Sequence, residues 1–157
     1  TNLVLRQMKK QNHGHIIHTG SIVAITPLPY FTLYNTTKSA IYMFNRSLRY
    51  ELKNTNVTST VVLPARMKTG FAKVAYDCYE KEGNLICVDK FNKTAGDPTI
   101  VARSIIKKMH KGKEVITPTM RAKVLYLMRY FARPIDLINK NIMGPKELKH
   151  IQMLKQK

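Results

Sequence analysis

The sequence predicts an α/β fold in which helices cover a parallel sheet. Two short apolar segments, residues 15–19 and 57–63, are rich in β-branched residues, which is typical of buried parallel strands. Residues 31–54, which have helical periodicity, separate them. Because a strand, a helix and a second strand in this order form a right-handed crossover, we expect the two strands to lie parallel in one sheet.

Glycine residues mark the ends of the first predicted elements of the chain. Residues 1–11 place apolar side chains at helical intervals, and Gly14 ends this pattern, so the segment is predicted to be the end of an amphipathic helix. The strand at residues 15–19 then lies between Gly14 and Gly20. Two prolines after this strand predict a loop before the long helix.

The long helix is predicted to cover the sheet with an apolar stripe. Residues 31–54 carry apolar side chains at steps of three and four, the spacing of one helix face. The stripe consists of Ala40, Ile41, Phe44, Leu48 and Leu52. The strand at residues 57–63 follows, and Pro64 ends it because proline has no N–H to donate to a neighbouring strand.

Residues 66–96 are predicted to form a lid over a ligand. The segment has no clear periodicity, carries many apolar and aromatic residues, and follows the carboxyl end of a parallel strand. Open α/β folds bind ligands at that edge, and long loops there are usually functional. The apolar content favours a hydrophobic ligand, although side chains that merely pack on the core would give the same pattern.

A helix and a short strand follow the lid. Asp97 is the predicted N-cap, and Pro98 is the first residue of a helix that Gly112 ends. Its inward face is expected to consist of Ala102, Ile105, Ile106 and Met109. Residues 114–117 are the predicted last strand, which ends at Pro118.

Residues 119–157 are predicted to be a basic helical extension of the first domain, residues 1–118. The helix covers residues 120–141, and Pro134 interrupts it. Its apolar side consists of Leu125, Met128, Ile135 and Ile138. An apolar side with cations around it is typical of a helix on a membrane surface, but also of an ordinary surface helix. Both interpretations stay open.

Composition limits the functional classes. A chain of 157 residues with 44% hydrophobic residues can bury the core of one globular domain. Its net charge of +18 suggests a polyanionic partner, but the basic residues are scattered and form no stripe with interleaved aromatics, so we expect no specific nucleic-acid site. No apolar run approaches the ~20 residues of a membrane-spanning helix. The expected location is the cytoplasm, with membrane association left open.

The cysteines and histidines predict neither disulfides nor a metal site. Cys78 and Cys87 are the two cysteines of the sequence, and their spacing matches no metal-ligand pattern. His15 and His18 lie on one predicted strand, where alternation places them on opposite faces. A reducing compartment is therefore expected.

Three polar residues near the end of the first strand are the candidate catalytic residues. Ser21 follows the strand, and Tyr34 and Lys38 lie one helical turn apart on the long helix, so these two side chains share a face. A lysine ammonium near a phenol favours the phenolate and lets the tyrosine act as an acid-base catalyst. The Tyr-x-x-x-Lys pair alone is a weak signal, because about one chance match is expected in such a chain.

The order and spacing of three motifs resemble the short-chain dehydrogenase/reductase family. The motifs read HTGS at residues 18–21, YNTTK at 34–38 and PARMKT at 64–69. Ala65 stands where the family has glycine, which keeps a small residue near the cofactor. The resemblance extends from the first residues to about Pro118 and implies a Rossmann-like, doubly wound parallel sheet.

The resemblance implies hydride transfer between a nicotinamide cofactor, NAD or NADP, and a carbonyl or alcohol carbon. Tyr34 would be the general acid or base, Lys38 would also hold the ribose hydroxyls, and Ser21 would bind the substrate oxygen. Cofactor contacts would further include Pro64, Ala65, Met67 and Thr69. The helix between Tyr34 and Leu52 would also join subunits into a homo-oligomer. The substrate implied by the lid is an apolar carbonyl or alcohol.

The family's Gly-rich phosphate loop and Asn-Ala-Gly stretch do not occur in this sequence. We therefore expect the chain to represent only the C-terminal portion of the fold, with residues 1–118 as half of a nucleotide-binding domain and residues 66–96 as its lid. Alone, it is expected to bind a dinucleotide weakly and to be inactive. The alternative is a non-catalytic fragment or relative that acts as a basic interaction module on a membrane surface or nucleic acid.

Overall fold

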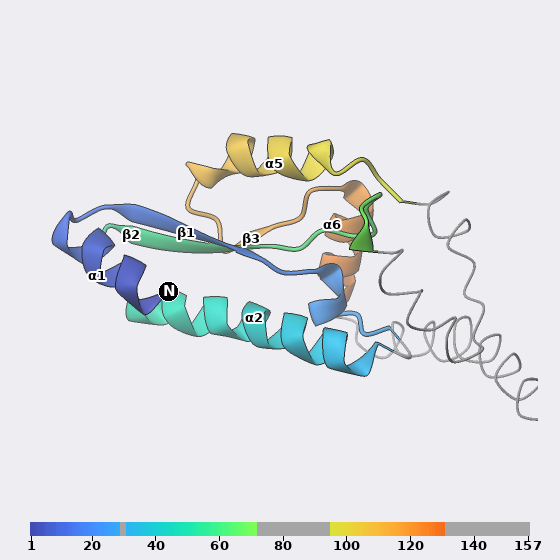
Figure 1. The fold of residues 1–157 in the computed structure, drawn as a ribbon, viewed down its shortest axis with the longest axis horizontal. Coiled ribbons are helices and arrows are strands. Elements are labelled where there is room, and N and C mark those ends of the chain that lie inside the picture. Colours follow the sequence, from blue (N-terminus) through green and yellow to red (C-terminus); the bar gives the residue numbers. More distant parts are fainter. Residues whose placement is uncertain (29–30, 72–94, 131–157) are drawn as a thin grey trace, which may run out of the picture.

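The chain folds as three layers around a short parallel sheet. In this computed structural model, which describes residues 1–28, 31–71 and 95–130, the sheet has three strands in the order β1-β2-β3. They are β1 (Gly14–Thr19), β2 (Val57–Val62) and β3 (Val115–Ile116). Helices α1 (Asn2–Lys10) and α2 (Thr32–Glu51) lie on one face of the sheet, and α5 (Thr99–Met109) lies on the other (Figure 1).

The strands confirm the predicted parallel crossover. β1 and β2 run parallel along their full lengths, and α2 connects them. β3 pairs in parallel with the other edge of β2, so β2 is the central strand. Val57, Val61 and Val62 of β2 are at most 2% exposed, as expected for β-branched residues of a strand covered on both faces.

Two apolar clusters lie between the sheet and the helices α1 and α2. The first cluster, at the amino ends of the strands, consists of Leu5, Leu48, Leu52 and Val57. The second cluster, at the carboxyl ends, consists of Ile22, Val23, Tyr42, Val61 and Leu63. Tyr34, Ala65 and Leu125 pack against the second cluster, so segments that are far apart in the sequence meet at the carboxyl edge of the sheet.

The buried face of α2 differs from the predicted stripe. The prediction is confirmed for its two leucines, which are buried, but it is wrong for Ala40 and Phe44, which are exposed. Tyr42 and Asn45 are buried in their place. Both have hydrogen-bond partners inside the protein, and a satisfied polar group can be buried without a large penalty. A pattern based on hydropathy cannot anticipate such partners.

Helix α5 is also less buried than predicted. It begins at Thr99 with Pro98 as its N-cap, one residue after the predicted N-cap Asp97, whose carboxylate accepts from the Thr99 N–H at 2.8 Å. The inward face was predicted wrongly at Ala102 and Ile106, which are exposed. Ser104 is its one buried residue.

A short 3-10 helix, η1 (Ile22–Ala24), follows β1, and α6 (Met120–Met128) follows β3. Residues 72–94 of the predicted lid lie outside the described residues, as does the C-terminal extension beyond residue 130. The division of the chain near residue 118 therefore stays a prediction. In the part of the chain that is described, no helix combines the length and the hydropathy needed to span a membrane.

Candidate functional site

The candidate site lies at the carboxyl ends of β1 and β2, where η1 meets the start of α2 (Figure 1). Ser21 is the N-cap of η1, and its Oγ accepts a hydrogen bond from the Val23 N–H at 3.4 Å. The Ile22 N–H donates to the Pro64 carbonyl at 2.9 Å and thereby holds η1 beside the end of β2. Because the Ser21 oxygen acts as an acceptor here, its O–H is still able to donate.

Gly20 allows β1 to end close against the neighbouring strand. Its N–H donates to the Val62 carbonyl at 2.9 Å, which extends the pairing of the two strands by one residue. A Cβ at this position would lie 2.9 Å from side-chain atoms of Leu63 and Val61. The glycine is thus required by close packing, and it fixes the position of Ser21, the next residue.

Tyr34 and Lys38 meet on the first turns of α2. The Lys38 Nζ lies 5.7 Å from the centroid of the Tyr34 ring and donates to the Thr19 carbonyl at 3.2 Å. The Tyr34 ring is half-buried and has its centroid 5.0 Å from that of Phe71. The structure therefore joins this pair to the end of β1, two residues before Ser21.

Two further residues position the start of α2, and the sequence analysis did not identify them. The Asn35 side-chain amide donates to the Leu28 carbonyl at 2.7 Å and accepts from the Leu28 N–H at 3.4 Å. The Ser39 hydroxyl donates to the Ala24 carbonyl at 3.0 Å. Their signal in the sequence is that each directly follows a candidate catalytic residue, Tyr34 or Lys38, on the same helix.

The predicted cofactor contacts on the segment after β2 are only partly gathered at the site. Pro64 holds η1 through its carbonyl, and Ala65 packs against the same cluster as Tyr34. Met67 instead pairs with Gly96 in an isolated parallel bridge. Thr69 is exposed, and among the described residues no contact joins it to Tyr34 or Lys38.

The histidines of β1 lie on opposite faces of the sheet. The His15 Nε2 pairs with the Thr60 Oγ1 at 2.7 Å, and the His18 ring lies edge-on to Phe44 with centroids 5.5 Å apart. Burial is the main cause that lowers the pKa of both imidazoles. Within the described residues, no three His, Cys, Asp or Glu side chains are grouped as metal ligands would be.

The polar groups at this edge fit the ribose and nicotinamide end of a dinucleotide. The Lys38 ammonium has three N–H donors and uses one of them on the Thr19 carbonyl, so donors remain for ribose hydroxyls. Ala65, like Tyr34, packs against the second cluster and has only a methyl side chain. The donor set thus agrees with the chemistry that a nicotinamide cofactor requires.

Comparison with known proteins identifies a family. The model of the short chain dehydrogenase family matches residues 1–79. An uncharacterised short-chain type dehydrogenase/reductase of Sinorhizobium fredii is 35% identical over 75 residues, which cover 48% of this chain and 30% of that protein. The chain thus spans less than a third of this relative's length.

Solved structures share the fold. A short chain dehydrogenase/reductase from Burkholderia phymatum in complex with NAD aligns with a TM-score of 0.68 at 18% identity, over 87% of this chain and 53% of that one. A short-chain dehydrogenase from Sphingobium yanoikuyae in complex with NADPH aligns with a TM-score of 0.66 at 19% identity, over 92% and 50%. This likeness shows an α/β Rossmann-like parallel sheet.

These findings correct the expected placement of the resemblance. The family model matches residues 1–79, which puts the Rossmann, nucleotide-binding region in the N-terminal half of this chain. The assignment of the chain to only the C-terminal portion of the fold, without that region, is therefore wrong. Both halves of a doubly wound fold repeat the strand-helix-strand unit, so β1, α2 and β2 do not by themselves fix the place of the unit.

Proposed function

The chain belongs to the short-chain dehydrogenase family, and from this premise we propose that it takes part in the NAD(P)-dependent interconversion of a carbonyl and an alcohol. The proposal depends mainly on one observation. Lys38 lies 5.7 Å from the Tyr34 ring and is hydrogen-bonded to the end of β1, beside Ser21. An acid-base group, a cation and a hydroxyl donor thus occupy the edge where parallel sheets bind ligands.

Each of the three residues has a distinct role in the proposed reaction. Tyr34 gives a proton to the substrate oxygen during reduction and takes it back during oxidation. The Lys38 ammonium lies beside the Tyr34 ring and binds the ribose hydroxyls. The Ser21 O–H donates to the substrate oxygen and fixes its position.

A nicotinamide dinucleotide, NAD or NADP, supplies or accepts the hydride when it is bound. Lys38 and the segment that begins at Pro64 and Ala65 would hold its ribose and nicotinamide end. Support for this cofactor class comes from the fold shared with two short-chain dehydrogenases that were solved in complex with NAD and with NADPH.

An apolar substrate is supported by the surroundings of Tyr34. The Phe71 ring lies 5.0 Å from the Tyr34 ring and is partly exposed, so it offers apolar surface beside the reacting oxygen. The Phe31 ring is also near, with its centroid 6.4 Å from that of Tyr34. A substrate with an alkyl or aryl group next to its carbonyl would cover both rings and gain the free energy of burial.

A substrate series tests this proposal. We expect the full-length protein to reduce aldehydes and ketones with NADH or NADPH, with kcat/KM rising along the series of increasing alkyl length. Phe71→Ala should reduce the increase of kcat/KM with alkyl length. Phe44→Ala, which changes a ring outside the site, should leave that increase unchanged. The absence of turnover with every substrate and both cofactors would contradict the proposal and favour a non-catalytic, basic interaction module.

A homo-oligomer through α2 is supported by its outer face. This face exposes large apolar side chains, namely Leu33, Met43, Phe44 and Tyr50. An exposed apolar helix face of this kind marks a protein interface. Sedimentation analysis of Met43→Glu tests the proposal: the variant should dissociate at concentrations at which the parent chain is associated, and a parent chain that is always monomeric would contradict it.

A further inference from the structure

Helix α6 carries apolar side chains on two opposite faces. Its inner face packs on the body of the protein through Ala122, which is fully buried, and through Leu125 and Tyr126. The opposite face carries Met120, Val124 and Leu127, which are 72%, 48% and 51% exposed. Steps of four and three residues align these three side chains in one row along the helix.

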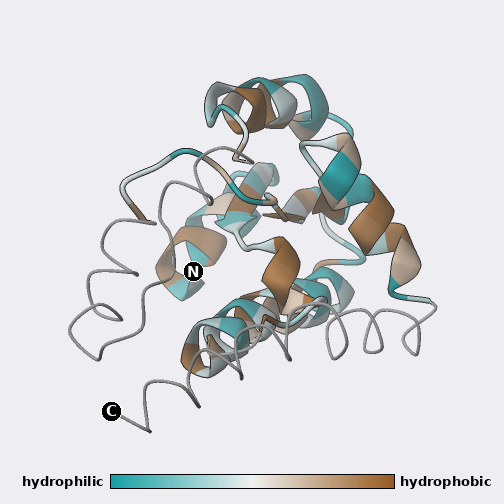
Figure 2. Ribbon diagram, turned by 90° about the vertical axis from the view of Figure 1, so that its right-hand side faces the viewer, coloured by the Kyte–Doolittle hydropathy of each residue, from teal (hydrophilic) through white to brown (hydrophobic). Residues whose placement is uncertain are grey.

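Cations flank this outer row of Met120, Val124 and Leu127, named here the α6 row. Arg121 and Lys123 are exposed, and at 100° per residue they lie on either side of the row. Tyr130 is exposed just beyond the helix. The sequence has no Asp or Glu between Glu114 and residue 130, so no carboxylate of this segment offsets the cations. Figure 2 shows hydrophobic and hydrophilic residues alternating along α6 at the margin of the molecule.

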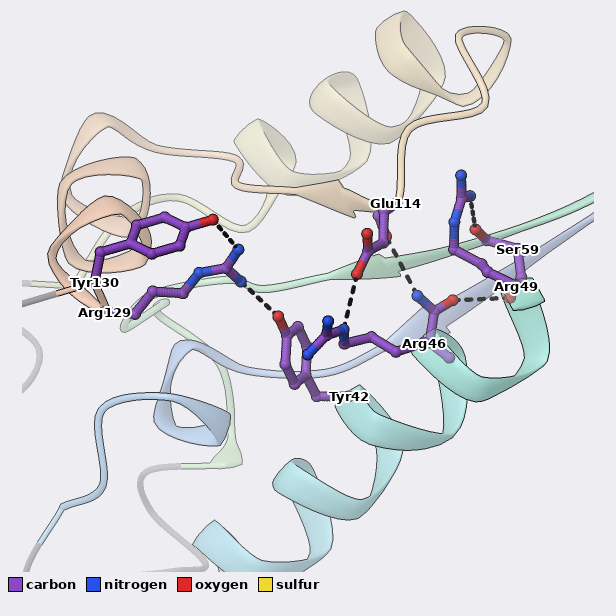
Figure 3. Close-up of polar contacts among 8 residues, drawn as sticks. Tyr42, Arg46, Arg49, Ser59, Glu114, Arg129 and Tyr130 are labelled. Atoms are coloured by element: carbon purple, nitrogen blue, oxygen red, sulfur yellow. Dashed lines mark hydrogen bonds and ion pairs between the residues drawn. The ribbon is translucent and has the colours of Figure 1, made fainter. Parts of the chain in front are cut away.

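The helix that presents this row is fixed to the body of the protein. The Arg129 guanidinium donates to the Tyr42 hydroxyl of α2 at 2.5 Å and to the Tyr130 hydroxyl at 2.6 Å (Figure 3). It also stacks on the Tyr126 ring at 3.9 Å from the centroid. At the other end of α6, the Thr119 hydroxyl caps the helix by accepting from the Ala122 N–H. The α6 row is therefore a preorganised surface.

We propose that the α6 row binds an anionic membrane surface, with Met120, Val124 and Leu127 entering the headgroup boundary and Arg121 and Lys123 meeting lipid phosphates. The argument for a lipid surface is complementarity of charge and shape. An apolar row between cations matches the boundary between acyl chains and anionic headgroups, and the chain carries a net charge of +18 that favours such a surface. This inference does not depend on the proposed dehydrogenase activity.

The chain has no tryptophan, so a single introduced tryptophan reports on one site. We would compare Met120→Trp with Ile106→Trp, in which the new indole lies on an exposed position of α5. The probes are vesicles of phosphatidylcholine alone and of phosphatidylcholine with phosphatidylserine. Met120→Trp should shift its emission to shorter wavelength, and brominated lipid should quench it, only with anionic vesicles. Ile106→Trp should show neither change.

Binding variants separate this inference from general attraction between a basic protein and an anionic surface. In vesicle sedimentation, Arg121→Gln with Lys123→Gln should weaken binding by about fivefold for each cation removed. Lys107→Gln with Lys111→Gln, which removes the same charge from exposed positions elsewhere, should weaken it far less. Leu127→Ser should weaken it by about tenfold, since its apolar burial is lost.

Two results would overturn the proposal. If both pairs of charge substitutions weakened vesicle binding equally, the net charge of the protein alone would attract it to the vesicles, without a defined binding surface. Emission that shifts with protein concentration but not with vesicles would assign the α6 row to a protein interface. Circular dichroism of each variant confirms that the fold is intact before these comparisons are made.

Discussion

The two halves of α2 differ in how their polar side chains are held. In the first half, Lys38 has one hydrogen bond to the backbone of β1, and Tyr34 is held by packing against aromatic rings and the second cluster. In the second half, polar side chains join α2 to β2, to the residues around β3 and to α6 in a continuous network. This network has two hydrogen-bonded or ion-paired groups, Tyr42 with Arg129 and Tyr130, and Asn45 with Arg46, Arg49, Ser59 and Glu114. The Arg46 guanidinium, 6.0 Å from the centroid of the Tyr42 ring, joins the two groups (Figure 3).

Asn45 is at the centre of this network and is completely buried. Its side-chain oxygen accepts from the Ser59 hydroxyl at 2.8 Å, and its amide donates to the Glu114 carbonyl at 3.4 Å. Arg49, one turn later, donates to the Ser59 carbonyl at 2.5 Å and to the Gly112 carbonyl at 3.2 Å. The second half thus anchors the helix, and the first half presents side chains to the site.

The comparison shows that the residues that anchor α2 and the candidate catalytic residues occupy different parts of one helix. A catalytic side chain must be positioned accurately and yet keep hydrogen-bonding capacity for its ligands. In α2 the anchoring bonds are made by the second half and, beside the site, by Asn35 and Ser39, so Tyr34 and Lys38 need few bonds of their own. Substitutions in the first half should therefore change activity, and substitutions in the second half should change stability.

The largest effect is expected for Lys38→Ala in the full-length protein. Loss of the ammonium would remove the proposed contact with ribose and the cation beside Tyr34, so cofactor affinity should fall and kcat/KM should drop by about a thousandfold. The free energy of unfolding should change by less than about 0.5 kcal/mol, as for a partly exposed side chain. Titration with NADH and NADPH, steady-state kinetics and urea unfolding measure the three quantities.

The control is Lys53→Ala, which changes an exposed lysine beyond the end of α2. Unchanged cofactor affinity in Lys38→Ala would argue against the role of Lys38.

Asn45→Ala should produce the opposite pattern. The substitution leaves the Ser59 hydroxyl and the Glu114 carbonyl without their partner, which should lower the free energy of unfolding by about 2 kcal/mol. Activity per folded molecule should change little. Urea unfolding measures the loss, with Ser47→Ala on the exposed side of the same helix as the control. Equal stability of the two variants would show that the network does not anchor α2.

Arg129→Lys tests the end of the network with a smaller expected effect. An ammonium cannot donate to Tyr42 and stack on Tyr126 at once, so we expect a loss of about 1 kcal/mol. Hydrogen exchange should become faster in α6 and stay unchanged in β2. Arg121→Lys, an exposed arginine of the same helix, should have no effect. Faster exchange throughout the sheet would show instead that α6 is part of the global folding unit.

The smallest effect concerns pH. Burial lowers the pKa of His15 and His18 below the ordinary value of 6.5 in the folded chain, so the unfolded chain binds more protons. The free energy of unfolding should therefore be constant above about pH 6.5. It should decrease as the pH falls from there through the pKa values that the two histidines have in the folded chain. Urea midpoints between about pH 5 and 8 measure the slope, which His15→Asn should reduce and the exposed His13→Asn should not. A rise in stability toward low pH would contradict this sign.

Much of the fold follows from local sequence signals. The β-branched segments and Pro64 predict β1, β2 and the end of β2, and glycines and prolines bound the other elements near their observed limits. The buried faces of the helices were harder to predict, because Tyr42 and Asn45 become core residues through partners that lie far away in the sequence. Periodicity reports hydropathy, whereas burial of a polar group depends on tertiary contacts.

The candidate site, too, could be predicted only in part from the sequence. The i, i+4 spacing of Tyr34 and Lys38 predicts that they meet, because a helix fixes that distance. The hydrogen bond from Lys38 to Thr19 and the ties made by Asn35 and Ser39 required the structure, since they join separate elements. The place of this unit in the family's fold was predicted wrongly, because a repeated strand-helix-strand unit carries no marker of its position.

The most direct test of the proposed chemistry is Tyr34→Phe, with turnover and cofactor affinity measured on one preparation of the full-length protein. Phenylalanine keeps the ring that packs beside Phe71 and on the second cluster and removes only the hydroxyl that we propose as the proton donor. We expect unchanged NAD(P)H affinity and urea stability, with kcat lowered by at least about a hundredfold. A Tyr34→Phe enzyme that keeps half of its turnover would contradict the account.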